Sequence, residues 1–312
     1  MSKIAFIYPG QGAQKAGMGA DFYENSEIAR YIFDQAGEEL DLDMKELCFE
    51  ENDRLDLTEY TQAAMVTTCL AMTRVAESKG LKADITAGLS LGEYPAIAAA
   101  GGMNDMDAIR LVRKRGILMQ NTVPAGEGAM CAVISMAAEE IEKVIEPIAD
   151  VSVANYNCPG QIVITGKTDA VEEAAAKLKE AGARRTIMLN VSGPFHSQML
   201  VPAGEKLAEE LEHTRFHELR IPYVTNVTAE KVTDIRETPG LLTTQISSPV
   251  RWMQSMERMI ADGVDTFVEI GPGKTLEGFL RKIDRSVKVF HISQWEDVDK
   301  VCTELADSGK MM

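Results

Sequence analysis

The sequence predicts an α/β protein with a hydrolase-like parallel-sheet core and an inserted ferredoxin-like βαββαβ subdomain. Expected strands and helices alternate at the start of the chain, and a Gly-x-Ser-x-Gly sequence, typical of a strand-to-helix turn, lies at one of the junctions. From residue 129 the order changes to strand, helix, strand, strand, helix, strand. A chain of 312 residues has room for a large domain that carries an insertion. We therefore assign residues 1–123 and 193–312 to a large α/β domain and residues 124–192 to a small subdomain.

The first part of the chain is expected to alternate between strands and helices. The expected elements are an apolar strand ending at Tyr8, a strand at 84–87, and helices at 59–78, 91–100 and 105–119. Gly80 supplies a C-terminal cap for the helix before it. Pro95 conflicts with the helix at 91–100, because proline is easily accommodated only in a first turn. Strand followed by helix, repeated, predicts a parallel sheet.

The inserted segment contains a complete βαββαβ unit. Its expected strands are 129–134, 151–156, 161–165 and 183–191, and its expected helices are 138–148 and 169–181. The large domain then resumes with helices at 201–211 and 252–261, an extended segment at 221–225 and a buried strand at 266–270. Open α/β sheets place their sites where strands end in loops, and Gln11, Ser90 and Gly271 lie at such ends.

Composition limits the classes of partner. With 32 Lys+Arg against 48 Asp+Glu, the formal charge of −16 repels nucleic acid and anionic membrane surfaces. The first apolar strand is too short for a signal-peptide core, and no apolar run reaches membrane-spanning length. Five scattered cysteines show neither metal spacing nor an even count, so we read them as reduced thiols. The chain is expected to be cytoplasmic, without a metal and without a permanently bound cofactor.

The Gly88-Leu89-Ser90-Leu91-Gly92 sequence has the spacing of a nucleophile elbow. A strained turn pushes the serine hydroxyl outward, and the flanking glycines remove side chains that would block its approach. In such enzymes the backbone N–H of the next residue, here Leu91, donates to the oxyanion. The Gly10-Gln11-Gly12 loop is a candidate for the second donor. A glycine-rich turn without chemistry is the alternative interpretation.

Four histidines are available to activate a serine hydroxyl. His213 and His217 stand four residues apart among polar neighbours, which indicates exposed surface positions more than a metal site. His291 lies in an apolar segment that resembles a buried strand, so it is expected to be a packed structural residue. His196 lies in the loop that leaves the inserted unit, where it can face a cleft between the two parts of the chain. Elimination therefore favours His196 as the base.

Two glycine-rich loops lack the full sequence pattern for phosphate or dinucleotide binding. Lys15 stands where the Gly10-Gln11-Gly12 fingerprint needs its third glycine or alanine, so that fingerprint fails. The Gly271–Thr275 loop lacks the first half of a P-loop and is expected to be a tight strand-to-helix turn. No carboxylate can be selected from 48 acidic residues as a third member of a triad.

Several motifs in one order resemble the malonyl-CoA:acyl carrier protein transacylase family. They are Pro9–Gln14, the Ser90 turn followed by Glu93-Tyr94, Arg115-Gly116 with Met119-Gln120, Asn155-Tyr156-Asn157, Gly193–His196 and Val268–Gly273. The resemblance covers almost the whole chain, and it implies a small ferredoxin-like subdomain. It also implies a ping-pong reaction in which Ser90, activated by His196, accepts a malonyl group from malonyl-CoA and passes it to the phosphopantetheine thiol of acyl carrier protein.

The resemblance also implies roles for individual residues. Gln11 and Leu91 would supply the oxyanion donors, and the backbone carbonyl of Gln245 would orient His196, giving a dyad that needs no acid. Arg115 would pair with the free carboxylate of malonate, which suits a guanidinium because it forms two charge-assisted hydrogen bonds to a carboxylate. Without the resemblance, Arg115 reads as a surface cation on its helix.

Further residues are candidates for contacts with coenzyme A or the carrier protein. An enzyme with a charge of −16 needs a local positive patch to dock an acidic carrier protein. The resemblance implies this role for Arg184 and Arg185, with Asn155 and Asn157 as further candidates. Additional basic candidates are Arg251, Lys274, Arg281 and Lys282. Solvated surface charge is the alternative for all of the basic residues, and a monomer is expected.

Two positions depart from the family pattern, and three alternatives remain open. Leu89 replaces a histidine that many members have before the serine, and Phe195 replaces a serine found in some relatives. The alternatives to malonyl transfer are a polyketide-pathway acyltransferase, an acyl hydrolase of the same fold and a catalytically silent carrier-binding scaffold. Arg115 argues against a simple thioesterase, and the presence of both Ser90 and His196 argues against a silent scaffold.

Overall fold

A six-stranded sheet forms the centre of the larger part of the molecule. The computed structural model describes residues 3–307 and 309. The strands, in the order β10-β9-β1-β2-β7-β8, are β10 (Lys288–Ile292), β9 (Val264–Ile270), β1 (Lys3–Tyr8), β2 (Ile85–Gly88), β7 (Tyr223–Val224) and β8 (Lys231–Val232). Neighbouring strands from β10 to β7 run parallel, and only β8 pairs antiparallel. The predicted parallel-sheet core is confirmed.

Both faces of this sheet are buried, as is usual when helices cover a parallel sheet. Along β1, Phe6 and Tyr8 join one core, while Ala5 and Ile7 join another on the opposite face. The first core includes residues of α2 (Glu27–Leu40), α3 (Met44–Phe49), α4 (Thr58–Ser78), α5 (Glu93–Ala99), α6 (Asp105–Asn121), α9 (Val201–Glu212), α10 (Thr238–Gln245) and α13 (Trp295–Asp307). The second includes residues of α11 (Trp252–Ala261) and α12 (Thr275–Ile283). Short elements complete this part: α1 (Ala20–Asn25) and the 3-10 turns at Ser90–Gly92, Gln198–Leu200 and Ile235–Glu237.

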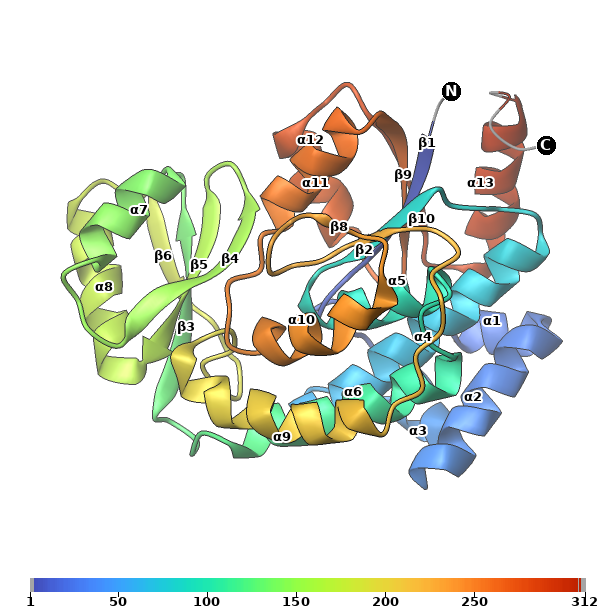
Figure 1. Ribbon diagram of the computed structural model, residues 1–312, viewed down its shortest axis with the longest axis horizontal. Coiled ribbons are helices and arrows are strands. Elements are labelled where there is room, and N and C mark those ends of the chain that lie inside the picture. Colours follow the sequence, from blue (N-terminus) through green and yellow to red (C-terminus); the bar gives the residue numbers. More distant parts are fainter. Residues whose placement is uncertain (1–2, 308, 310–312) are drawn as a thin grey trace.

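A separate antiparallel sheet lies beside the large one (Figure 1). Its order is β4-β5-β3-β6, with β3 (Gly128–Ile134), β4 (Val151–Cys158), β5 (Gln161–Lys167) and β6 (Arg185–Met188). Helices α7 (Ala138–Ile145) and α8 (Thr168–Glu180) cover its outer face, where Cys131 and Val133 point. Met130 and Ala132 point the other way, into the core of the large part. The βαββαβ order is confirmed, whereas the exact boundaries at 123/124 and 192/193 stay a prediction.

The structure resolves the difficulty at Pro95. Residues 90–92 form a 3-10 turn and α5 begins only at Glu93, so Pro95 falls in the first helical turn, where it is tolerated. The expectation of a buried strand around His291 is wrong. Strand β10 is an edge strand, and His291 is partly exposed, with its Nδ1 3.7 Å from Glu277.

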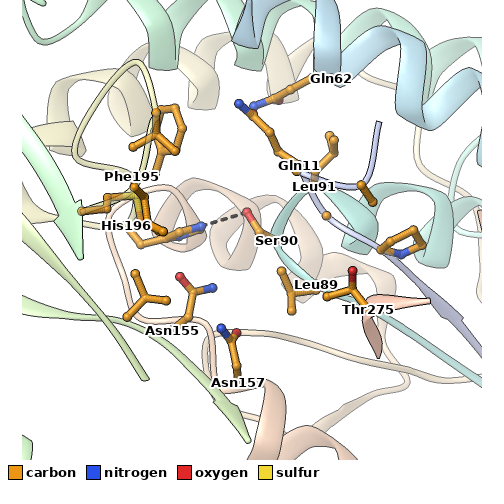
Figure 2. A pocket seen from close by; sticks show the side chains of 18 of the residues that line it. Gln11, Gln62, Leu89, Ser90, Leu91, Asn155, Asn157, Phe195, His196 and Thr275 are labelled. Atoms are coloured by element: carbon orange, nitrogen blue, oxygen red, sulfur yellow. Dashed lines mark hydrogen bonds between the residues drawn. The ribbon is translucent and has the colours of Figure 1, made fainter. Parts of the chain in front are cut away.

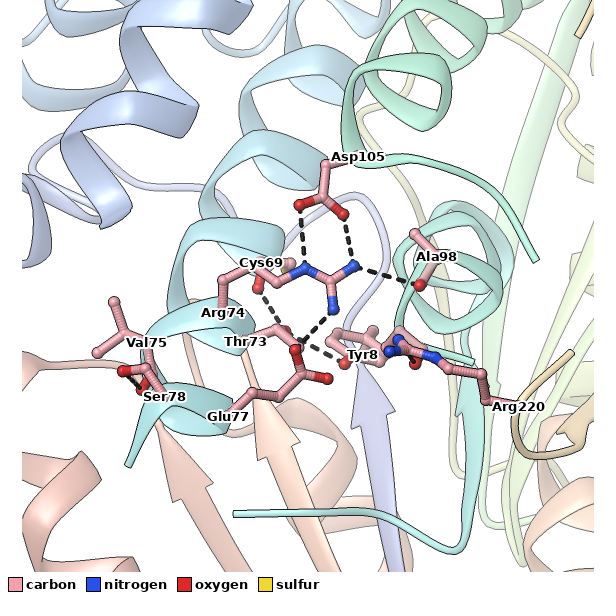
Figure 3. A network of polar contacts seen from close by, with 11 residues as sticks. Tyr8, Cys69, Thr73, Arg74, Val75, Glu77, Ser78, Ala98, Asp105 and Arg220 are labelled. Atoms are coloured by element: carbon pink, nitrogen blue, oxygen red, sulfur yellow. Dashed lines mark hydrogen bonds and ion pairs between the residues drawn. The ribbon is translucent and has the colours of Figure 1, made fainter. Parts of the chain in front are cut away.

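An arginine-centred network joins the helices behind the sheet (Figure 3). Arg74 of α4 donates two hydrogen bonds to Asp105 at the start of α6, at 3.0 and 2.6 Å, and one to the carbonyl oxygen of Ala98 in α5 at 3.2 Å. Beside it, Thr73 donates to the Tyr8 hydroxyl of β1 at 3.1 Å. The network therefore fixes α5 and α6 relative to the strand that precedes the Gln11 loop.

Candidate active site

A pocket of about 250 Å³ opens where the two sheets meet. Its lining combines the segments that follow β1 and β2 and the first residues of α12 with residues from the inner face of the small sheet. Among the lining residues are Gln11, Leu89, Ser90, Arg115, Met130, Asn155, Asn157, Phe195, His196 and Thr275. Figure 2 shows Ser90 and His196 turned toward each other across this space, with Asn155 and Asn157 below them. Carboxyl ends of parallel strands thus form one wall of the pocket, as expected for an open α/β sheet.

Ser90 lies in a strained turn that only small neighbours permit. Its φ angle is 52°, which is uncommon for a residue other than glycine. A Cβ atom on Gly88 would lie 1.8 Å from the carbonyl oxygen of Gly92, and one on Gly92 would lie 2.2 Å from that of Tyr8. The two glycines are therefore required for close backbone approach, and the turn presents the Ser90 side chain to the pocket.

Ser90, His196 and Gln245 form a chain of hydrogen bonds. Ser90 Oγ lies 2.8 Å from His196 Nε2, and His196 Nδ1 lies 2.9 Å from the backbone carbonyl oxygen of Gln245. Because a carbonyl oxygen only accepts, Nδ1 carries the proton and Nε2 is free to accept one from Ser90. Burial, and next the positive charge of Arg115, lower the pKa of His196 to about 4. The ring is therefore neutral near pH 7 and suited to act as a base.

Arg115 reaches the same point from α6. It is only 1% exposed, so the surface-cation alternative is wrong. Its Nη2 donates to Ser90 Oγ at 3.1 Å and to Gln245 Oε1 at 3.0 Å, while Nη1 donates to Gln62 Oε1 at 2.9 Å. Burial lowers the pKa of the guanidinium. Within the part of the chain that the structure describes, no carboxylate forms an ion pair with Arg115, so its charge is available to a ligand.

The backbone of the serine turn is held by a second layer of polar groups. Asn226 Oδ1 accepts from the Ser90 N–H at 2.6 Å, and Asn226 Nδ2 donates to the carbonyl oxygen of Gly88 at 2.7 Å. Gln245 Nε2 donates to the carbonyl oxygen of Ser90 at 3.0 Å and to Glu93 Oε2 at 2.7 Å. These side chains restrain the residues on both sides of the strained φ angle.

The two residues expected to supply oxyanion donors both line the pocket. Leu91 directly follows Ser90, and Gln11 lines the pocket from the loop after β1. The side chain of Gln11 is tied to the start of α4, because its Nε2 donates to Thr58 Oγ1 at 2.9 Å. That bond fixes the orientation of the Gln11 side chain. The assignment of both N–H groups to an oxyanion stays a prediction.

The predicted coenzyme A or carrier-protein residues divide into two groups. Asn155 and Asn157 are buried lining residues, and Asn157 Oδ1 has no hydrogen-bond partner among the described residues. Arg184 and Arg185 are exposed at the start of β6 and do not line the pocket. The remaining basic candidates, Arg251, Lys274, Arg281 and Lys282, are also exposed, and Arg281 pairs with Glu277.

The other histidines lie outside the site. His213 is exposed at the end of α9, and His217 is half-buried. Over residues 3–307, no group of three or more His, Cys, Asp or Glu side chains is arranged to hold a metal ion. In the same residues, no helix is long and apolar enough to cross a membrane.

Two residues of the site were not predicted from the sequence. Gln62 lies within α4 with no motif around it, and nothing in its sequence context points to Arg115. Asn226 follows the extended segment at 221–225, so the rule that polar residues at strand ends form sites would have found it.

Comparison with known proteins agrees with this geometry. A family model described as acyl transferase domain matches residues 5–297. The chain belongs to this acyl transferase family. A malonyl CoA-acyl carrier protein transacylase from Bacillus subtilis (strain 168) is 44% identical over 314 residues, which cover 99% of each chain. The resemblance recognised in the sequence motifs is confirmed.

Solved structures of acyl transferases share the fold over nearly the whole chain. The crystal structure of a malonyl CoA-acyl carrier protein transacylase from Clostridium perfringens is 42% identical, with a TM-score of 0.95, and covers 99% of this chain and 98% of that one. A malonyl-transacylase solved in complex with a type II polyketide acyl-carrier protein is 35% identical, with a TM-score of 0.94, covering 97% and 100%. The parallel core with its separate antiparallel sheet is therefore shared by this acyl transferase and these enzymes.

Proposed function

We propose that this acyl transferase moves a malonyl group from malonyl-CoA to the phosphopantetheine thiol of acyl carrier protein through an ester on Ser90. The observation that carries the proposal is the buried guanidinium of Arg115, 3.1 Å from Ser90 Oγ and without a carboxylate partner among the described residues. A guanidinium in such a position matches an acyl group that ends in a carboxylate. The relatives that carry the name malonyl CoA-acyl carrier protein transacylase support the same substrate.

In the first half-reaction, His196 Nε2 takes the Ser90 hydroxyl proton as Oγ attacks the thioester carbonyl carbon. The carbonyl oxygen becomes an oxyanion, which the backbone N–H groups of Gln11 and Leu91 stabilise. When the tetrahedral intermediate collapses, the carbon–sulfur bond breaks and the coenzyme A sulfur leaves with the proton from His196. The malonyl ester remains on Ser90, and its free carboxylate binds Arg115.

In the second half-reaction the carrier protein's thiol takes the place of coenzyme A. His196 removes the thiol proton, the sulfur attacks the ester carbonyl, and Ser90 Oγ leaves with that proton. The Gln245 carbonyl keeps Nδ1 protonated throughout, since it accepts from Nδ1 at 2.9 Å. In this proposal Asn155 and Asn157, which line the pocket, contact the pantetheine arm, and the exposed Arg184 and Arg185 offer positive charge to the carrier protein.

The proposal extends to the surroundings of the enzyme. We place it in the cytoplasm as a monomer with no resident cofactor, and malonyl-CoA is a substrate. Its five cysteines are all free thiols, which suits a reducing compartment. The carrier protein belongs to fatty acid synthesis in this proposal. A polyketide carrier is a second candidate, because one solved relative is bound to a type II polyketide acyl-carrier protein.

The test is intact-mass spectrometry of the protein after separate incubation with malonyl-CoA and acetyl-CoA. We expect a malonyl adduct on the wild type, far less acetyl adduct, and none on Ser90→Ala. Adding holo carrier protein should move the label to the carrier, whereas the apo carrier should receive none. Absence of the malonyl adduct, or equal loading of acetyl, would overturn the proposal. Loss of the label to water at the same rate with and without the carrier would identify a hydrolase instead.

A further inference from the structure

A buried carboxylate that the mechanism above does not use lies directly behind the serine turn. Glu93, the first residue of α5, is 0% exposed. Its Oε2 accepts hydrogen bonds from Gln245 Nε2 at 2.7 Å and from the Asn226 N–H at 3.1 Å. Burying a carboxyl group is energetically costly unless it is hydrogen-bonded, so a buried Glu93 beside the active site is expected to have a role there.

Glu93 determines which way the side-chain amide of Gln245 points. The two nearest acceptors of Gln245 Nε2 are Glu93 Oε2 at 2.7 Å and the carbonyl oxygen of Ser90 at 3.0 Å, and Asn226 Oδ1 lies at 3.4 Å. If the amide rotated by half a turn, its oxygen would face both of these acceptors and its NH₂ group would face the guanidinium of Arg115. An acceptor would then face an acceptor at each of the first two contacts, and a donor would face a donor at Arg115, so these hydrogen bonds would be lost. Glu93 therefore keeps Gln245 Oε1 directed at Arg115.

In this arrangement the charge of Arg115 is not neutralised by an ion pair with any carboxylate of the described residues. The guanidinium is held by two uncharged amide oxygens, Gln245 Oε1 at 3.0 Å and Gln62 Oε1 at 2.9 Å. Glu93 reaches Arg115 only through the Gln245 amide and does not occupy the hydrogen-bond donors of the guanidinium. An acyl carboxylate can thus bind to a guanidinium that is already oriented.

We propose that Glu93 is a positioning residue: through the side-chain amide of Gln245 it orients Arg115 and so sets the preference for acyl groups that end in a carboxylate. The inference rests on the proposed function, because it concerns selectivity at the same serine. It assigns Glu93 no contact with the substrate. What it requires is one acceptor oxygen at the position of Glu93 Oε2.

Two substitutions distinguish the effect of the acceptor oxygen of Glu93 from the effect of the size of its side chain. Glu93→Gln keeps one acceptor oxygen, whereas Glu93→Met has a similar length and none. Initial rates of ester formation from malonyl-CoA and acetyl-CoA give a selectivity ratio for each protein. We expect Glu93→Gln to keep the wild-type ratio within about threefold, and Glu93→Met to lower it at least about tenfold. The loss should come from a higher KM for malonyl-CoA, with acetyl loading changed much less.

The matched control is Asp105→Asn, which weakens the Arg74 network away from the pocket. A variant that only reduces the amount of folded protein lowers both loading rates together, so the control should keep the wild-type ratio. If Glu93→Met does not fold, Gln245→Met can replace it, because it removes the side-chain amide that connects Glu93 to Arg115. This variant should lower the malonyl-to-acetyl selectivity ratio equally. The Gln245 backbone carbonyl, and with it the contact to His196, stays in place.

The outcomes distinguish this inference from the proposed function. If the wild type forms a malonyl ester but Glu93→Met or Gln245→Met keeps its selectivity, only the inference is overturned. It is equally overturned if Glu93→Gln loses as much selectivity as Glu93→Met, since an acceptor oxygen would then not suffice. If the wild type forms no malonyl ester, the proposed function and the inference both fail.

Discussion

Arg115 Nη2 lies 3.1 Å from the hydroxyl oxygen of Ser90, so a buried positive charge adjoins the atom that would carry the acyl group. Burial of this guanidinium is unfavourable without a counter-charge. The carboxylate of a bound malonyl group would supply that counter-charge, and an acetyl group would not. Selectivity in this acyl transferase would then depend on the substrate completing an ion pair that the protein leaves open.

Replacing Arg115 with alanine should therefore change the preferred acyl group. We expect malonyl loading of Arg115→Ala to fall about 30- to 100-fold, equivalent to about 2–3 kcal/mol for a charged hydrogen bond. Acetyl loading should stay the same or rise, because the pocket loses an unpaired charge that disfavours binding of an apolar acyl group. Competition between the two thioesters, followed by intact-mass spectrometry, measures the ratio.

The neighbouring Lys114→Ala is the control for this prediction. Lys114 is exposed and its Nζ lies 3.6 Å from Glu210, away from the pocket. Its substitution should leave the loading ratio unchanged. An Arg115→Ala protein that still selects malonyl as the wild type does would refute the role proposed for Arg115.

The rate of acyl transfer from the thioester to Ser90 should fall at acid pH in a way that reflects the low pKa of His196. We call this fall the acid limb of the pH–rate profile. The neutral ring is the active form, and the pKa is about 4, so activity is present at neutral pH and is lost as the pH falls through about 4. Loading from acetyl-CoA is the cleaner probe, because that substrate has no carboxyl group of its own to titrate. Rapid quench followed by mass spectrometry gives the rate at each pH.

Arg115→Gln tests the cause of this shift. The positive charge of Arg115 is one of the causes that lower the pKa of His196, second to burial. Removing the charge should move the acid limb to higher pH while leaving it below the usual histidine range near 6.5. An acid limb at the same pH in both proteins would show that burial alone sets the value.

The architecture could be predicted from the sequence because its signals are local. The helix over 252–261 was predicted with its observed bounds, and its buried Trp252, Met256 and Met259 recur at helical spacing. Strand β6 was predicted too long, at 183–191 instead of Arg185–Met188, because the residues on either side, such as Arg184 and Leu189, still hydrogen-bond to β3 and no local signal marks where the ladder ends. His291 was misjudged because an apolar run does not distinguish an edge strand from a central one.

The site could be predicted only where a motif names the residue. Ser90 was recognised from its two flanking glycines, and His196 from its place in a loop. Gln62 and Asn226 contact Arg115 and Ser90 from segments 53 and 136 residues away along the chain. Such pairings depend on how α4 packs beside α6 and where β7 ends, which local pattern does not encode.

Substitution of the glycine before the serine turn should prevent folding. A Cβ on Gly88 would lie 1.8 Å from the Gly92 carbonyl oxygen, and backbone on both sides cannot move without breaking the turn. We expect Gly88→Ala to yield little soluble protein. Gly278→Ala is the matched control, since nothing lies within 4 Å of its added Cβ in α12. Alanine there should raise stability by about 0.5–1 kcal/mol, and a soluble, active Gly88→Ala protein would contradict the elbow geometry.

Glu93 should make stability depend on pH in a defined direction. Burial raises its pKa from the ordinary value of 4.5 to about 7, so between these values the folded protein keeps a proton that the unfolded chain has released. The stabilisation linked to that proton is complete below pH 4.5 and is lost as the pH rises through about 7. Glu93→Gln cannot titrate, so its stability lacks this change.

The measurement is urea unfolding of the wild type and Glu93→Gln at several pH values between 4.5 and 8. The free energy of unfolding of the wild type, minus that of Glu93→Gln, should fall by at most about 3 kcal/mol over this range, from about 1.4 kcal/mol per pKa unit. Glu269, whose pKa burial also raises to about 7, is present in both proteins, so its contribution cancels in the difference. A difference that stays constant with pH, or that grows as the pH rises, would show that Glu93 is already ionised at the low end of the range.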